Sequence, residues 1–468
     1  MELIAKNSIR DEGLGGLAST AGCHILKWEF PFYYGGIEAA LEAVKESVEN
    51  IIAAQGEDGS WRFHPNERTQ NLGREGDAVL GTCASNALTL LKYARISGDE
   101  AALQAGRKSL EFMDGFKVPR GAQAWECPLY EPDILAAALA IGAYVEAYRI
   151  TRERHYLERA EYWAKTGLPF LFFWNNPQRP GMRYASIPVF GTTFYTHSWF
   201  GVPVQWNGLV YAYHLQHLAE YSAIFPWKQI AEGITVSAMY QQWTEGELKG
   251  TYPDGFYGYC TEGRAPHINP EDIMVNLYAL RGLDPDISTA IVPMGDSRIH
   301  ISSGAKVQDA TLSSEESQAQ PAETLTFNLR YAQNEISYTL IRGFGKLATE
   351  SSFYSITANG ETLSEVENLQ DIPTGCYSYR EPDAVYLKVL HPVEMVNIEV
   401  QRGEITQEKE SEPTPPVEEH LPKDAEGIPM DAIGTGAAEE VTPEEQVVEE
   451  EIPVTEEPIN QEDENTED

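Results

Sequence analysis

The sequence predicts a mainly α-helical chain with a C-terminal all-β region, and three observations support this fold class. From Gly36 to about Leu283, apolar residues recur at three- and four-residue steps, which is the period of amphipathic helices. From about Asp286, short runs of alternating residues follow, as in half-buried strands. From Gly403 onward, Glu, Pro and Thr dominate and aromatic residues are absent. We therefore expect a lead-in over residues 1–34, an α/α-hairpin toroid domain over 35–285, an antiparallel β-sandwich domain over 286–402 and a disordered acidic tail over 403–468.

Eight helices are predicted in the first region, most of them long. They cover residues 37–52, 77–96, 100–113, 134–148, 154–166, 204–221, 227–243 and 270–281. Tight and long connections alternate between them, which is typical of helical hairpins stacked in a ring with the long loops at one mouth. A closed ring of six hairpins has twelve helices, so either the ring is incomplete or further hairpins precede Met1.

Strands are predicted where alternation is clearest, at residues 324–331, 336–341, 385–389 and 396–400. Turn residues such as Asn359 and Gly360 separate these runs, and their spacing predicts an antiparallel sandwich of roughly eight strands. The tail cannot bury enough apolar surface to offset its ordering entropy, and it is therefore expected to stay disordered.

The formal net charge of −38 is unevenly distributed. Residues 403–468 hold 23 acidic residues against 2 Lys, a net of −21. The remaining 402 residues hold 49 acidic and 32 basic residues, a net of −17. Because even the body of the chain is acidic, we expect neither nucleic acid nor an anionic membrane as a partner.

The cysteines and the apolar runs narrow the class of protein further. The five cysteines are scattered and form no CxxC pair, which argues against a disulfide framework and a four-thiolate zinc site. The run at residues 134–148 contains Glu146 and is shorter than the roughly 20 residues that a membrane span needs. We expect no metal, no cofactor and no transmembrane helix.

No secretory signal is visible, so the expected location is cytoplasmic unless the chain begins partway into a longer protein. The oligomeric state is left open.

The clearest local motif follows the first predicted helix and reads Gln55-Gly56-Glu57-Asp58-Gly59-Ser60-Trp61. Asp-Gly permits a sharp turn, and the Trp is expected to pack back onto the hairpin. The pattern Q-x-x-D-G-S-W resembles the hairpin-closing turn of α/α-toroid proteins, among them terpenoid cyclases and several glycan-processing enzymes. A structural role is favoured for it.

A second segment, residues 124–133, gathers carboxylates and aromatic rings directly before a helix. Asp133 at the helix start is explained by the helix dipole. Glu126 beside Trp125 has no such explanation. A carboxyl group against a large ring can have a raised pKa and act as a general acid, so Glu126 is a catalytic candidate.

Two further segments hold candidate ligand-binding groups. The stretch from Met182 to Gly208 is long for a loop in a helical domain, and its aromatic content indicates order. The stretch from Tyr252 to Cys260 has a D-G turn character, in which Asp254 is a possible second carboxylate. With the second segment included, the candidate substrate-binding residues are Trp125, Glu131, Arg183, Tyr184, His197, Trp199, Gln205, Trp206, Asn207 and Tyr257.

Taken together, the D-G-S-W turn, the W-E-C-P-L-Y-E-P-D segment and the long aromatic loop resemble the six-hairpin glycosidase-like superfamily, and more narrowly a bacterial branch of it. The resemblance covers about residues 30–282. A β-sandwich after a toroid also fits carbohydrate-active enzymes. The resemblance implies either a hydrolase with paired carboxylates or a lyase that uses Tyr, His and Asn. It gives no residue-by-residue match to either catalytic set.

The leading hypothesis is a glycoside hydrolase that acts on a poly- or oligosaccharide in an aromatic-lined cleft. Glu126 would be the general acid, and Asp254 or Asp133 the base or nucleophile. The alternative is a non-catalytic toroid that binds a glycan or a protein. A polysaccharide lyase and a terpenoid-cyclase-like enzyme are disfavoured, the latter because no Asp-x-Asp-Asp or D-D-x-x-D run is present.

Overall fold

The computed structural model of this chain describes residues 24–25, 37–175, 182–190, 202–257, 262–315, 322–330, 336–345, 352–367, 375–381, 383–391 and 394–404. Nearly all of the expected lead-in and the tail beyond residue 404 lie outside these residues.

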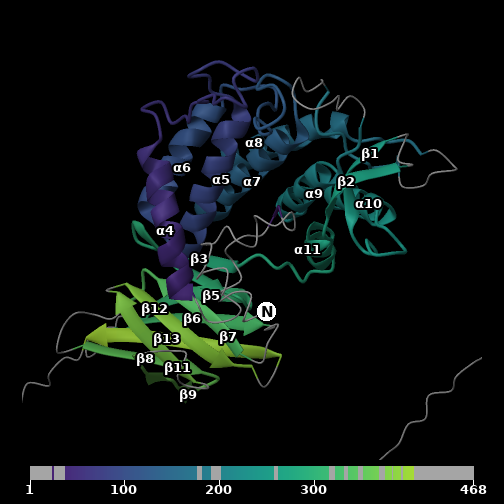
Figure 1. The fold of residues 1–468 in the computed structure, drawn as a ribbon. Coiled ribbons are helices and arrows are strands. Elements are labelled where there is room, and N and C mark those ends of the chain that lie inside the picture. Colours follow the sequence, from purple (N-terminus) through teal and green to yellow (C-terminus); the bar gives the residue numbers. More distant parts are fainter. Residues whose placement is uncertain are drawn as a thin grey trace, which may run out of the picture. The chain divides into compact units, whose positions relative to one another are not determined.

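Eight α-helices lie in the described part of the chain, and each coincides with a predicted one (Figure 1). They are α4 (Ile37–Ala53), α5 (Leu80–Ser97), α6 (Glu100–Met113), α7 (Ile134–Thr151), α8 (Arg154–Gly167), α9 (Gln205–Ala219), α10 (Trp227–Tyr240) and α11 (Glu271–Leu280), with a short 3₁₀ helix, η2 (Leu168–Phe170), after α8. The prediction of a helical region with eight helices is confirmed.

The helices pack as hairpins in two rows. In one row α7 packs between α5 and α9, while α6, α8 and α10 pack on α5, α7 and α9 respectively. Burial follows this arrangement: 14 of the 18 residues of α7 and 13 of the 15 in α9 are buried, against 7 of the 14 in α8. Helices that are buried on nearly all sides therefore form the inner row, and helices with an exposed face cover them.

One helix in the described residues, α7, is long and apolar enough to cross a membrane when only length and composition are considered. In its 18-residue window, 78% of the residues are buried by the surrounding protein. This is the ordinary situation of a core helix, so the finding is weak evidence for a membrane span.

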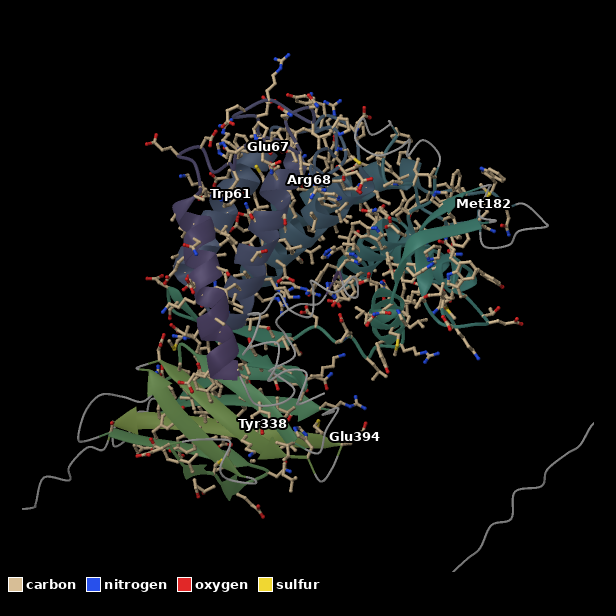
Figure 2. All side chains as sticks on the ribbon, viewed as in Figure 1. Trp61, Glu67, Arg68, Met182, Tyr338 and Glu394 are labelled. Carbon is tan, nitrogen blue, oxygen red and sulfur yellow. The ribbon has the colours of Figure 1, made fainter. Side chains whose placement is uncertain are left out.

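The Q-x-x-D-G-S-W turn closes α4 against α6. Gln55 Nε2 donates to the carbonyl oxygen of Ala105 at 2.9 Å, and Asp58 Oδ1 accepts from the hydroxyl of Ser60 at 2.7 Å. Trp61, labelled in Figure 2, is buried and donates from Nε1 to the carbonyl oxygen of Ile51 at 2.9 Å. Gly59 has a φ of +87°, and a Cβ there would lie 2.4 Å from the Lys108 carbonyl oxygen, so the turn requires glycine. These contacts give the motif a structural role.

The strands after α11 form two sheets. The six-stranded sheet has the order β10-β11-β12-β7-β4-β3 and the five-stranded sheet the order β5-β6-β13-β8-β9. Their bounds are β3 (Ser288–Met294), β4 (Ser297–Ser303), β5 (Lys306–Glu315), β6 (Ala322–Arg330), β7 (Ile336–Arg342), β8 (Ser352–Ala358), β9 (Glu361–Thr362), β10 (Ser364–Glu365), β11 (Cys376–Glu381), β12 (Ala384–Leu390) and β13 (Met395–Glu404). All four predicted runs are strands, namely β6, β7, β12 and β13.

Residues from both sheets share one hydrophobic cluster. Ile299, Ile341 and Leu387 come from the six-stranded sheet, and Phe327 and Ile398 from the five-stranded sheet. All five side chains are almost fully buried. The helical region is therefore followed by a multistranded region with its own apolar core.

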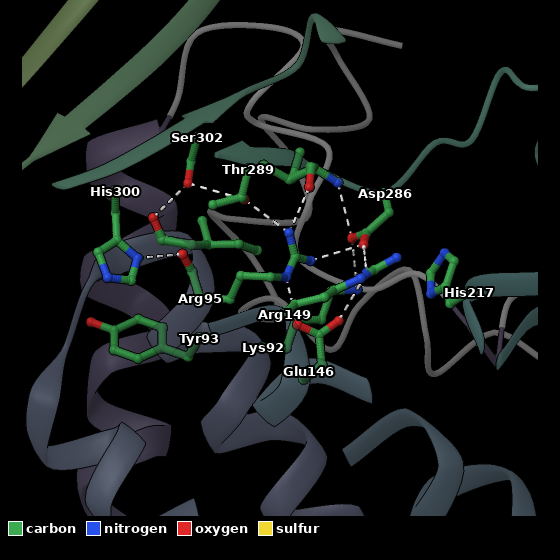
Figure 3. Close-up of polar contacts among 12 residues, drawn as sticks. Lys92, Tyr93, Arg95, Glu146, Arg149, His217, Asp286, Thr289, His300 and Ser302 are labelled. Atoms are coloured by element: carbon green, nitrogen blue, oxygen red, sulfur yellow. Dashed lines mark hydrogen bonds and ion pairs between the residues drawn. The ribbon is translucent and has the colours of Figure 1, made fainter. Parts of the chain in front are cut away.

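A buried polar network joins α5 and α7 to the start of the strand region (Figure 3). Arg95 on α5 reaches Glu146 Oε2 on α7 at 2.5 Å and Asp286 Oδ2 at 2.8 Å. Lys92 and Arg149 also pair with Asp286, at 3.4 and 3.2 Å. Burial disfavours the charge on Asp286, but Arg95 and Lys92 outweigh it and hold the pKa of this carboxyl well below its usual range.

Candidate ligand-binding site

The start of α9 is fixed by a buried amide. Gln205 Nε2 donates to the carbonyl oxygen of Ile234 at 2.9 Å, and Gln205 Oε1 accepts from the backbone N–H of Ser186 at 3.0 Å. Both contacts satisfy a fully buried side chain. The structure therefore places Gln205 as a packing residue, and its neighbour Trp206 is held in a defined position.

Trp206 is the centre of the candidate site. Its ring stacks on His24 with centroids 4.2 Å apart and on Trp125 with centroids 6.4 Å apart. Its Nε1 donates to Asp254 Oδ1 at 3.1 Å. Three predicted site residues, Trp125, Trp206 and Asp254, thus come together from distant segments. We call the group His24, Trp125, Trp206, Tyr252, Asp254 and Asp272 the aromatic–acid cluster.

His24 and Asp272 form the most tightly bonded pair of the aromatic–acid cluster. The backbone N–H of His24 donates to Asp272 Oδ1 at 2.8 Å, and His24 Nδ1 lies 2.6 Å from Asp272 Oδ2. The hydroxyl of Tyr252 donates to the same Oδ2 at 3.3 Å. Asp272 is fully buried in the first turn of α11.

The sequence reasoning missed His24 and Asp272 and did not single out Tyr252 as a site residue. One local signal was available, since Pro270 followed by Glu271 and Asp272 marks a helix start with acids in its first turn. Nothing in the local pattern joins that helix start to His24, because the two residues are 248 positions apart.

Asp254 and Gly255 lie in a strand, so the prediction of a turn at this dipeptide is wrong. Strand β1 (Tyr252–Tyr257) pairs with β2 (Glu262–Ile268), and the register shifts between Pro253 and Gly255. A bulge of this kind re-aims a side chain. The backbone N–H of Phe256 donates to the carbonyl oxygen of Pro203 at 2.9 Å, which ties β1 to the segment before Trp206.

Trp125 is presented to solvent by a segment that is anchored at Cys127. Cys127 is buried in a cluster with Val189 and Val204, against which Trp206 packs. Burial raises the pKa of the Cys127 thiol, so this residue acts as a small apolar anchor. Trp125 itself remains 48% exposed. A large exposed ring on an anchored segment is available to a ligand.

Asp133 is the N-cap of α7 and lies outside the aromatic–acid cluster. Its Oδ1 accepts from the Ala136 N–H at 2.5 Å and its Oδ2 from the Ala122 N–H at 2.9 Å. Burial raises the pKa of Asp133 to about 7, although these N–H donors act in the opposite direction. Oδ1 therefore caps α7, and Oδ2 holds the backbone of the loop at Ala122, which gives Asp133 a structural role. Glu126 and Glu131 are both half-buried in the segment that precedes it.

The remaining predicted residues are only partly described. The exposed guanidinium of Arg183 lies 5.2 Å from the ring centre of Tyr184, which packs edge-on against Phe173. These contacts lie outside the aromatic–acid cluster. His197, Trp199 and the side chain of Tyr257 lie outside the described residues.

Asn207, next to Trp206, is fully buried. Its Nδ2 lies 3.5 Å from Gln123 Oε1, and within the described chain its Oδ1 has no hydrogen-bond partner. Buried polar atoms in native proteins usually have a partner, so this oxygen has the capacity to accept one more donor.

No family model matches the sequence, and no curated protein matches it. Solved structures do resemble it. An unsaturated glucuronyl hydrolase from Streptococcus agalactiae is 15% identical, with a TM-score of 0.40, over 60% of this chain and 74% of that one. An α-mannanase of glycoside hydrolase family 76 from Bacteroides thetaiotaomicron is 10% identical, with a TM-score of 0.38, over 55% of this chain and 66% of that one. A cellobiose 2-epimerase from Bacillus thermoamylovorans is 13% identical, with a TM-score of 0.33, over 48% of this chain and 61% of that one. These structural neighbours are all six-hairpin glycosidase-like toroid proteins.

Proposed function

We propose that the aromatic–acid cluster binds a carbohydrate and that the chain is a glycoside hydrolase acting on a poly- or oligosaccharide. One observation carries this proposal: the exposed ring of Trp125 stacks with Trp206, whose N–H is bonded to the carboxylate of Asp254. Aromatic faces next to a few fixed polar groups are the usual composition of small-molecule sites. Sugars offer such a site an apolar ring face and a rim of hydroxyl groups.

The proposed chemistry assigns one role to each of two carboxylates. Glu126, next to Trp125 in the chain, is the general acid that protonates the leaving oxygen. Asp254, oriented by the Trp206 N–H at 3.1 Å, is the base or nucleophile on the other side of the scissile bond. Retaining enzymes hold such carboxyl groups about 5–5.5 Å apart and inverting enzymes about 6.5–9.5 Å apart, so the separation in a ligand complex decides the stereochemistry.

The second candidate function is glycan binding without catalysis. It is favoured by the state of Asp272, the fully buried carboxylate of the cluster, which is already occupied by His24 and Tyr252. Paired-carboxylate chemistry therefore depends on Glu126 and Asp254 alone. If they do not act as a pair, the same rings still provide a binding platform.

We also infer the domain organisation that this function requires. The hairpins within residues 35–285 would belong to a toroid domain, supported by the two rows of helices. The strands within residues 286–402 would form a sandwich, supported by the hydrophobic cluster that both sheets share. The acidic segment 403–468 would remain a disordered tail, supported by its composition.

The test is hydrolysis of defined oligo- and polysaccharides by the wild-type chain, with products identified by mass spectrometry. Glu126→Gln and Asp254→Asn should each lower the rate by about a hundredfold or more, because each removes a proton-transfer or nucleophilic group. Glu394→Gln is the matched control, since this carboxylate is 63% exposed in the strand region. Full activity in both site variants would refute the assignment. Saturable binding without any product would favour the second candidate.

A further inference from the structure

His24 holds an unusual position for a residue that precedes the first described helix. Its backbone N–H and its ring nitrogen Nδ1 bind the two oxygens of a single carboxylate, Asp272, at 2.8 and 2.6 Å. Two contacts from one residue to one buried group fix both the backbone and the ring. The ring plane is further set by the stack on Trp206, at an interplanar angle of 19°.

The contact with Asp272 determines which nitrogen of His24 carries hydrogen. An ionised carboxylate only accepts hydrogen bonds, so Nδ1 must be the donor. In the neutral imidazole, Nε2 is then a hydrogen-bond acceptor. Within the residues that the structure describes, Nε2 has no bonded partner, and the His24 side chain is 29% exposed. The ring therefore presents a fixed acceptor.

The surroundings favour a ligand that donates hydrogen bonds. Asp272 has no ion pair with Lys or Arg in the described residues, and the only ionisable base bonded to it there is the imidazole of His24. Close by in the chain from Trp206, Asn207 contributes a buried Oδ1 that also lacks a donor. An exposed acceptor stacked on an aromatic ring is suited to a compound that offers both hydroxyl groups and an apolar face.

We propose that His24 and Asp272 form an acceptor pair of the ligand site, in which Asp272 fixes the tautomer and His24 Nε2 accepts a hydrogen bond from a hydroxyl group of a polyhydroxylated ligand. This assignment rests on the proposed carbohydrate site and adds to it a recognition group from the N-terminal segment. Asp272 is a positioning residue, and His24 is the group that touches the ligand.

The test is the rate at which diethyl pyrocarbonate acylates each histidine, followed by peptide mass mapping. The imidazole nitrogen that carries no hydrogen attacks a carbonyl carbon of the reagent and is acylated, with release of ethanol and carbon dioxide. The rate therefore depends on whether that nitrogen is accessible. His155 is the internal reference, because its ring nitrogen Nε2 pairs with a different carboxylate, Asp114, at 2.9 Å, so its rate should not depend on Asp272. In the wild-type chain His24 should be acylated at Nε2, and this rate is the one that Asp272 should control.

Asp272→Asn should slow the reaction at His24 by about tenfold or more and leave His155 unchanged, because the amide N–H₂ can turn the ring to the other tautomer. Circular dichroism and thermal unfolding establish that the variant is folded. If it does not fold, His24→Gln replaces it, and the expected result is a loss of oligosaccharide affinity of about tenfold. An unchanged His24 rate in folded Asp272→Asn, or an unchanged affinity in His24→Gln, overturns the proposal.

A panel of neutral and uronate-containing oligosaccharides separates this proposal from the proposed function. Protection of His24 by an oligosaccharide that binds supports both. Binding without protection of His24 overturns the ligand contact and leaves the carbohydrate site standing. A reactive, Asp272-dependent His24 in a chain that binds no member of the panel keeps the acceptor pair and overturns carbohydrate as its ligand.

Discussion

Two buried carboxylates in this chain, Asp286 and Asp272, have opposite surroundings. Asp286 is paired with two arginines and a lysine, the nearest at 2.8 Å (Figure 3). Asp272 is bonded to His24 and to the hydroxyl of Tyr252. Both side chains are buried, so burial alone does not distinguish them. What distinguishes them is whether the partners carry permanent charge.

The difference indicates which cluster is structural and which is available for function. Around Asp286, permanent cations neutralise the carboxylate. One of them, Arg95, also donates hydrogen bonds to the carbonyl oxygen of Ile287 and to the hydroxyl of Thr289. The network therefore joins helices to strands. Around Asp272, the partners are an imidazole and a phenol. The imidazole stacks on Trp206, and Trp206 stacks in turn on the half-exposed ring of Trp125. The second cluster is the one that can accommodate a ligand.

The largest expected effect is the loss of stability on substitution of Asp286, in the structural cluster. Asp286→Ala leaves buried cations without their shared partner, and it should lower the free energy of unfolding by about 3–5 kcal/mol. Urea unfolding followed by circular dichroism measures it. Glu394→Ala, which removes the exposed partner of Arg330, is the control and should cost less than about 1 kcal/mol. Equal effects of the two substitutions would mean that the network is not what joins the two regions.

The same carboxylate predicts how stability depends on acid. The pKa of Asp286 is lowered in the folded chain, mainly by Arg95 and Lys92 acting against burial. Its contribution to stability is therefore fully present above the unfolded pKa of about 3.9 and is lost as the pH falls through the lower folded value. Urea unfolding of the wild-type chain should show a loss of stability below about pH 4. Asp286→Asn should show a smaller loss, and an equal loss in both chains would contradict the pairing.

A third buried carboxylate, Asp133, differs from both Asp286 and Asp272 because its hydrogen bonds come from backbone N–H groups. Asp133→Ala should destabilise the chain by about 1–2 kcal/mol through loss of the cap, while Asn keeps an oxygen for the Ala136 N–H but loses the acceptor for the Ala122 N–H. Because burial raises the pKa to about 7, the folded state keeps a proton that the unfolded chain has lost. Relative to Asp133→Asn, the wild-type chain should thus lose stability as the pH rises from about 4 to 7. Asp99→Asn at the α6 cap is the control for capping itself. If the difference in unfolding free energy between the wild-type chain and Asp133→Asn did not change over this pH range, the pKa of Asp133 would not be raised in the folded chain.

The local parts of the fold could be predicted from the sequence because they depend on short-range patterns. Apolar spacing predicted all eight helices, and alternation predicted β6, β7, β12 and β13. The acid at Asp133 was correctly associated with a helix start. Asp254-Gly255 shows where such reasoning fails, since the same dipeptide suits a turn or a bulge, and only pairing with β2 decides between them.

The candidate site could be predicted only in part because it is built from long-range contacts. Trp206 meets Asp254 across 48 positions, and His24 meets Asp272 across 248. Unusual composition was enough to single out Trp125, Trp206 and Asp254, since rings and acids were concentrated near each of them. His24 and Asp272 stand in ordinary surroundings in the sequence, so only the folded chain brings them to notice.

Isothermal titration calorimetry of the wild-type chain and Trp125→Ala, with the oligosaccharides that bind in the panel, tests directly whether the aromatic–acid cluster binds a carbohydrate. Trp125 is 48% exposed, so its removal should leave the fold intact, and Tyr240→Ala on α10, where the ring is 63% exposed, is the control. We expect Trp125→Ala to weaken affinity by at least about tenfold, or roughly 1.4 kcal/mol, and Tyr240→Ala to have no effect. Unchanged affinity in Trp125→Ala, or an equal loss in both variants, would contradict a carbohydrate site at the aromatic–acid cluster.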